Sequence, residues 1–292
     1  MLILFLDEMI MSKCIFTFLI WVLSVGLYAQ KIHVVSIGIA DYQYIKDLKF
    51  TVNDVNLFNQ LMLNYGAEIK TLKNSHASHV NIISALRLIS AKAEQEDIVV
   101  VYFSGHGYPG GFCCWDFAGS SRNLISQNAD NQDLVAQSNR SRGGLSYKEM
   151  QILLRNCRAK RKIVFADACF SGGLRVGEQL NLSVQPVKNG EVIYFLSSQL
   201  DETSLESRPD EPFKNGIYTH FLVQALYGKA DVNKDALITL DEAFNYVDHK
   251  VLEYSVDADR NSRNAGNGPV QHQHPTLWGK YDKNMILFNV LK

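Results

Sequence analysis

Two apolar stretches of the sequence end in residues that could together perform nucleophilic chemistry. Residues 162–168 run into Cys169 and then break into Ser-Gly-Gly, and residues 98–103 run into Ser-Gly-His106-Gly. Short apolar runs bounded by turn residues predict buried strands, and ligands in an open α/β sheet bind outside the carboxyl ends of its strands. A thiol and an imidazole at two such ends form a Cys/His pair, in which the imidazole can take the proton of the attacking thiol.

Glycines follow both candidate catalytic residues. Gly107 and Gly172 leave the backbone free to approach a ligand closely, so the amides of Gly107 and Cys169 could bind the oxyanion of a tetrahedral intermediate. Taken singly, a strand-end cysteine is most often a small core residue, and a His-Gly pair usually marks a turn. Their occurrence together at two matched strand ends favours catalysis.

The rest of the chain alternates predicted strands with amphipathic helices. Besides the two strands above, the pattern predicts strands at 32–39, 68–72 and 191–197 and helices at 51–65, 78–94, 146–157, 215–227 and 240–251. Crossover-length helices between strands argue for an α/β fold, a three-layer α-β-α sandwich around a mainly parallel sheet. Residues 107–144 predict a long irregular stretch, and residues 259–274 predict a surface loop.

Composition and the N-terminus bear on location and partners. The chain has 292 residues and a formal net charge of -1, which gives no electrostatic case for nucleic acid or an anionic membrane as partner. Residues 1–30 contain an apolar run from Cys14 to Leu27 that is shorter than a membrane span of about 20 residues. We expect a cleaved export signal there, with Met11 as an alternative start and a retained membrane helix as the other reading. The mature chain, residues 31–292, is then one exported catalytic domain, periplasmic or secreted, for which we favour a monomer.

The two strand-end motifs resemble those of the caspase and metacaspase superfamily of cysteine peptidases. Tyr102-Phe-Ser-Gly-His106-Gly and Asp167-Ala-Cys169-Phe-Ser-Gly are most similar to the bacterial metacaspase-like branch. The resemblance implies a caspase-hemoglobinase fold, with Cys169 as nucleophile, His106 as general base and acid, and the Gly107 and Cys169 amides as oxyanion hole. It also implies protein or peptide substrates and no cofactor for the chemistry itself.

Charge gives an expectation about specificity. Asp167 lies two residues before Cys169 and faces the same side of the sheet, and Val-Asn-Asp54-Val resembles an Asn-Asp element of metacaspases. In that family the matching carboxylates line the pocket for the residue before the scissile bond, which implies a preference for Arg or Lys. The alternatives are a favourable helix-start charge for Asp54 and a strand-end hydrogen bond for Asp167. Ser197 and Ser198 resemble the family's substrate-binding edge.

A further segment, residues 231–242, has the spacing of an EF-hand calcium loop. The candidate ligands are Asp231, Asn233, Asp235, the Leu237 carbonyl and Glu242. Ala236 departs from the pattern, because the loop needs a positive φ there, which costs Ala roughly 1 kcal/mol. Calcium is therefore a candidate ligand, and the alternative is a metal-free loop between two helices.

These observations predict an exported cysteine endopeptidase that cleaves after Arg or Lys. Candidate self-cleavage sites are Arg140, Arg142 and Arg175. Two alternatives stay open: a caspase-like binding or scaffold module with little turnover, and a caspase-like peptidase that prefers another residue, such as Asp, before the scissile bond.

Overall fold

The computed structural model describes residues 30–108, 110–119, 143–169, 192–199 and 202–291. Residues Lys31–Lys292 form one compact unit. The expected export signal lies outside the described residues except for Gln30, and so do Gly172 and the three candidate self-cleavage sites. Within the described ranges, no helix combines the length and apolar character needed to cross a membrane.

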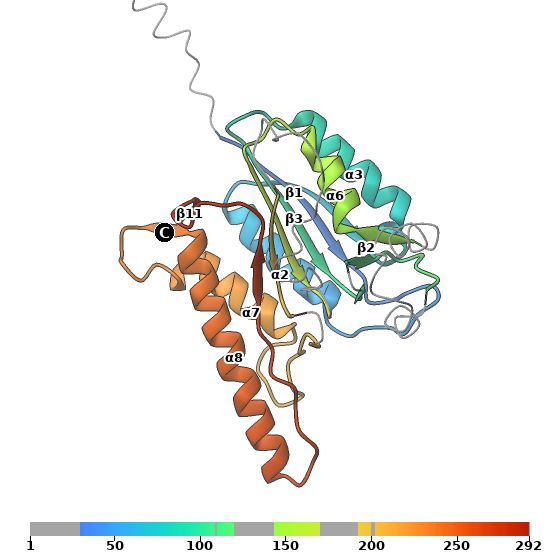
Figure 1. Cartoon of the computed structure of the whole chain (residues 1–292), viewed down its shortest axis with the longest axis vertical. Helices are drawn as coiled ribbons and strands as arrows, with labels where there is room; N and C mark the ends of the chain where they lie inside the picture. The colour runs from blue at the N-terminus through green and yellow to red at the C-terminus, as the bar shows by residue number, and fades with distance from the viewer. Residues whose placement is uncertain (1–29, 109, 120–142, 170–191, 200–201, 292) are drawn as a thin grey trace, which may run out of the picture. The chain divides into compact units, whose positions relative to one another are not determined.

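A six-stranded sheet lies at the centre of this unit (Figure 1), and its strand order is β10-β8-β7-β3-β1-β2. The strands are β1 (Ile32–Gly38), β2 (Glu68–Lys73), β3 (Ile98–Ser104), β7 (Arg161–Asp167), β8 (Val192–Leu196) and β10 (Thr276–Trp278). The first five are parallel, and β10 is antiparallel to β8. The carboxyl ends of β3 and β7 therefore meet at one edge, with Ser104 opposite Asp167.

Helices cover both faces of the sheet (Figure 1). Helices α3 (His79–Lys92) and α6 (Tyr147–Arg155) lie on one face, and α2 (Thr51–Asn64), α7 (Ile217–Gln224) and α8 (Leu240–Asn264) lie on the other. Because neighbouring strand residues face opposite sides, Val101 packs in the first core and Val100 in the second. The predicted three-layer sandwich with a mainly parallel sheet is confirmed.

Local sequence signals explain where several helices begin and end. Ser78 caps α3 by accepting from the Asn81 N–H, and Ser146 caps α6 by accepting from the Glu149 N–H at 3.1 Å. Helix α2 is followed by Gly66 at φ 71°, a conformation that only glycine adopts without strain. These helix boundaries agree with the sequence-based ones to within two residues.

Three regions differ from the predictions. The stretch after His106 contains a small antiparallel sheet of β4 (Gly107–Tyr108), β5 (Gly111–Cys113) and β6 (Gly144–Ser146). Helix α7 continues as a π-helical turn, η2 (Ala225–Lys229), before β9 (Leu237–Thr239), which pairs with β11 (Ile286–Asn289).

Helix α8 is the third difference, since it continues to Asn264 where the sequence predicted an end at residue 251. Buried Ser255 and Ala258 extend its packed face, and the Asp259–Arg263 ion pair at 3.0 Å supports its last turns. The Asn- and Asp-rich composition there resembles a loop, so the prediction of a loop from residue 259 onward was wrong for residues 259–264.

Candidate active site

The ends of β3 and β7 place His106 and Cys169 at adjoining positions. The Gly105 N–H donates to the Asp167 carbonyl at 3.1 Å, which continues the ladder beyond both strands. Two residues further on, Gly107 packs against the Cys169 backbone: a Cβ at position 107 would lie 2.2 Å from the Cys169 carbonyl oxygen. Only glycine allows this approach, so the two motifs identified in the sequence meet as one unit.

The His106 ring has a defined tautomer in the resting site. Its Nε2 lies 2.7 Å from the Lys46 carbonyl oxygen. A carbonyl only accepts, so Nε2 carries the hydrogen and Nδ1 is the free base of the neutral ring. Burial lowers the pKa of His106, and the hydrogen bond to Lys46 partly offsets this. The imidazole is therefore neutral near pH 7 and able to take a proton at Nδ1.

Tyr42 supports His106, and the sequence analysis did not identify it. Its hydroxyl accepts from the His106 N–H at 2.7 Å and donates to the Cys113 carbonyl at 3.4 Å. A Cβ at Gly105 would lie 2.6 Å from that hydroxyl, so the Ser-Gly-His motif needs its first glycine for this contact. Tyr42 follows the end of β1, the strand beside β3. Its position after a predicted strand is the sequence signal by which it could have been identified.

The Cys169 thiol is partly buried, and it is free, as are the buried thiols of Cys113, Cys114 and Cys157. Burial raises the pKa of Cys169, hydrogen bonds from the backbone amides of Ser204 and Cys169 lower it, and the negative charge of Asp167 raises it. The burial of Cys169 therefore favours a protonated thiol in the resting site.

Ser197 and Ser198 contact the backbone of Ala168, immediately before Cys169. Both are fully buried. The Ser197 hydroxyl accepts from the Ala168 N–H at 3.0 Å and lies 3.0 Å from the Ala168 carbonyl, to which the Ser198 hydroxyl also donates at 3.2 Å. The two side chains thus hold the turn that presents Cys169, and substrate binding by this edge stays a prediction.

Asp54 is one of the two expected pocket carboxylates, and it is buried. Its Oδ1 accepts from Asn215 Nδ2 at 3.0 Å and from the Gly216 N–H at 2.9 Å, and its Oδ2 accepts from the Ser104 hydroxyl at 2.7 Å. Burial, followed by the charge of Asp167, raises the pKa of Asp54 to about 8. The carboxyl is therefore largely protonated at neutral pH.

Asp167 lies beside it, also buried and hydrogen-bonded. Its Oδ2 accepts from the Thr219 N–H at 3.1 Å and from the Thr219 hydroxyl at 2.7 Å, and its Oδ1 accepts from the Ser204 hydroxyl. Burial raises the pKa of Asp167 as well. Burial thus favours the protonated form of both acids.

Glu206 is a third carboxylate at this site, and the sequence analysis missed it. Its side chain is exposed, and its negative charge raises the pKa of His106, Asp167 and Cys169. No spacing pattern marks Glu206, because the chain after β8 brings it to the site.

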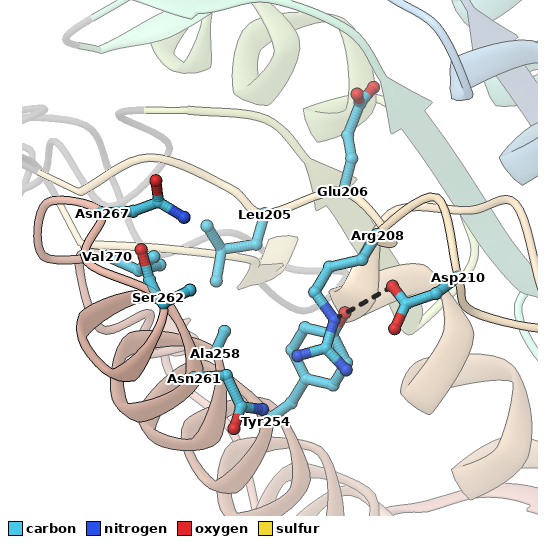
Figure 2. Close-up of a pocket in the computed structure, with 11 residues that line it drawn as sticks. Leu205, Glu206, Arg208, Asp210, Tyr254, Ala258, Asn261, Ser262, Asn267 and Val270 are labelled. Carbon is cyan, nitrogen blue, oxygen red and sulfur yellow. Dashed lines mark ion pairs between the residues drawn. The ribbon is translucent and has the colours of Figure 1, made fainter.

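A cavity of about 510 Å³ lies next to Glu206, between residues 205–210 and the C-terminal half of α8. Figure 2 shows Leu205 and Arg208 pointing toward α8, whereas Glu206 points away from the cavity. The Arg208 guanidinium lies 5.4 Å from the centre of the Tyr254 ring and pairs with Glu211 at 2.7 Å. Glu206 thus points toward the candidate catalytic residues, whereas Leu205 and Arg208 point toward the cavity.

The candidate calcium loop has some EF-hand features. Ala236 has φ 65°, as the pattern requires, and Asp231 accepts from the Asp235 and Ala236 amides at 3.2 and 3.1 Å. Glu242, however, accepts from the Thr239 amide and hydroxyl in a capping box that starts α8. Among the described residues, no three His, Cys, Asp or Glu side chains gather around one point that could hold a metal. The residues as placed do not make a calcium site, and calcium binding stays a prediction.

Comparisons with known proteins agree with this geometry. A family model described as the caspase domain matches residues 32–285. The crystal structure of caspase-1 from Spodoptera frugiperda is similar in fold, with a TM-score of 0.59 over 86% of each chain at 13% identity. No curated protein sequence matches the chain. The match spans both strand ends of the site, and the chain therefore belongs to the caspase-domain family of cysteine peptidases.

Proposed function

We propose that the protein is an exported endopeptidase of the metacaspase-like type that cleaves peptide bonds after Arg or Lys. The observation that supports the proposal is the close contact of Gly107 with the Cys169 backbone, which brings the two sequence motifs together at one edge of the sheet. The apolar run near the N-terminus supports export, since its length suits a cleaved signal.

The reaction follows from the resting protonation states. As the Cys169 sulfur attacks the substrate carbonyl, His106 Nδ1 takes the thiol proton, and the Gly107 and Cys169 amides stabilise the oxyanion. The protonated imidazole then gives this proton to the leaving amine, and a thioester remains on Cys169. His106 next deprotonates a water, which attacks the thioester and restores the thiol.

The acids around the site support a basic residue before the scissile bond. Asp54 and Asp167 are only 2% and 6% exposed, whereas Glu206 is exposed at the rim. In the proposed complex the substrate cation lies between the buried pair and Glu206, and the proton that the pair retains is released as the cation arrives. An aspartate side chain would meet three acidic groups there, so its binding is disfavoured.

The cavity supports an extended peptide rather than a single amino acid as substrate. Residues 204–208 run from the catalytic cysteine to the cavity wall. In the proposed complex the substrate residues before the scissile bond follow this segment, and their side chains reach the space between Leu205 and α8.

The test is a panel of fluorogenic peptides with Arg, Lys or Asp before the leaving group. It uses the full chain and Cys169→Ala, with and without calcium. Cleavage after Arg or Lys that the variant loses supports the proposal, whereas cleavage after Asp would keep the nucleophile and contradict the acidic pocket. If the folded wild type cleaves no peptide under any condition, the hypothesis of a binding or scaffold module replaces the proposed peptidase function.

A further inference from the structure

We propose that Gln273 is a positioning residue for the catalytic cysteine, acting through Ser204. The inference rests on the proposed function for its kinetic consequence and on the structure alone for its geometry. Gln273 belongs to residues 259–274, which the sequence predicted to be a surface loop, yet it is fully buried.

The side-chain amide of Gln273 uses both its donor and its acceptor groups. Nε2 donates to the Ser197 carbonyl at 2.8 Å and to the Ser204 hydroxyl at 3.2 Å, and Oε1 accepts from the Leu205 N–H at 2.8 Å. All three partners belong to the chain that follows β8. One buried amide therefore ties the start and the end of this connection together.

Ser204 carries this restraint to the reacting groups. Its hydroxyl donates to Asp167 Oδ1 while accepting from Gln273, and its backbone amide lowers the pKa of Cys169. The Ser204 amide stabilises a thiolate only when it points at the sulfur. Because Gln273 holds both the Ser204 hydroxyl and the next amide along the chain, it determines that direction.

Helix α8 in turn holds the backbone of Gln273 through a hydrogen bond. Its backbone N–H donates to the Ser255 hydroxyl at 3.2 Å, and that hydroxyl donates to the Leu252 carbonyl at 2.9 Å. The neighbouring His274 N–H donates to Glu202 at 2.8 Å. A residue that only filled space would be apolar, whereas a buried amide is tolerated where its hydrogen bonds are satisfied and set one geometry.

The experiment measures the alkylation rate of Cys169 by iodoacetamide against pH in the full chain, read at the Cys169 peptide by mass spectrometry. The variants are Gln273→Met, which keeps the size and removes all polar groups, and Gln273→Glu, which keeps the acceptor and removes the donors. His272→Ala is the matched control, since His272 lies in the same segment but pairs with Asp259 on α8. Thermal unfolding of each protein is measured in parallel.

We expect the alkylation midpoint to rise by about one pH unit in both Gln273 variants, the effect of losing one hydrogen bond to a charged group. With an Arg peptide, kcat should fall about tenfold while KM changes less than about twofold, and His272→Ala should match wild type. The Gln273→Glu defect should shrink at acidic pH, where the protonated acid donates again.

An unchanged midpoint in folded Gln273 variants would overturn the proposal. If both variants fail to fold, Ser204→Ala removes the same hydrogen bond from its other end, and the same rise is then required. If the midpoint rises but wild type cleaves no peptide, Gln273 positions the thiol as proposed and the peptidase function is the part that fails.

Discussion

The carboxyl groups of Asp54 and Asp167 lie on either side of Gly216. The Gly216 N–H donates to Asp54 at 2.9 Å, and a Cβ at Gly216 would lie 2.1 Å from Asp167 Oδ2. No side chain fits between them, so the two acids share one buried polar site, where the charge of Asp167 raises the pKa of Asp54. The protonation of this pair therefore depends on pH, and it affects both the stability of the fold and, in the proposed complex, the binding of a charged substrate side chain.

Asp54→Asn tests that link through stability. The raised pKa means that folded protein retains a proton between about pH 4 and pH 8 that the unfolded chain has lost. The free energy of unfolding should therefore fall as pH rises through this window, by up to about 1.4 kcal/mol per pH unit from this group. Urea unfolding between pH 4 and 8 should show a shallower fall in Asp54→Asn, because Asn cannot ionise. An identical slope would contradict the raised pKa.

Glu206→Gln should weaken both specificity and pH response. Removing the exposed charge should raise KM for an Arg peptide several-fold, and it should lower the pKa of His106, since Glu206 raises it. The acid limb of kcat/KM should then move to lower pH. Glu253→Gln, a surface change on α8, is the control. A KM that is unchanged for Arg peptides would remove Glu206 from the binding site.

The pH profile of the wild type should have a broad top. His106 must be neutral to act as base, and burial lowers its pKa, so kcat, which reports the substrate complex, should decline only below the ordinary histidine pKa of about 6.5. The raised pKa of Cys169 moves the alkaline limit upward from the ordinary thiol range. A steep loss of activity as the pH is raised from 7 to 8, or as it is lowered from 8 to 7, would contradict this assignment of protonation states.

Gly107→Ala should abolish activity. The added Cβ would meet the Cys169 carbonyl at 2.2 Å, which separates the two strand ends and displaces the proposed oxyanion donor. We expect a loss of at least a hundredfold in kcat/KM, of the size seen for loss of one oxyanion donor. Gly268→Ala has open space around its Cβ and should behave as wild type. An active, folded Gly107→Ala would show that the contact is dispensable.

Tyr42→Phe should reduce turnover without unfolding the protein. It removes the hydroxyl that accepts from the His106 N–H at 2.7 Å and leaves the ring in place beside the imidazole. We expect kcat to fall about tenfold with KM little changed, because the base loses its fixed position. Steady-state kinetics with an Arg peptide measures both constants. A tenfold change in KM with kcat unchanged would instead indicate that the Tyr42 hydroxyl serves packing.

The sequence by itself determined the sheet, most helices and the two strand ends that meet. Strand and helix periodicity is local, and the caps at Ser78 and Ser146 depend on residues three positions away. His106 and Cys169 could be identified because each follows its own apolar strand directly, and the carboxyl ends of parallel strands meet at one edge of a sheet.

Only the tertiary structure decided which other groups complete the site. Tyr42, Glu206 and Gln273 come from connections whose path no local pattern specifies, and Gln273 reaches Leu205 across 68 residues. Burial likewise depends on the folded chain. It raises the pKa of Asp54 and so favours the protonated acid. It also surrounds Gln273, which the sequence placed in a surface loop, with hydrogen-bond partners. Spacing in the sequence predicts residues that share an element, whereas hydrogen bonds between distant connections form only when packing removes water from them.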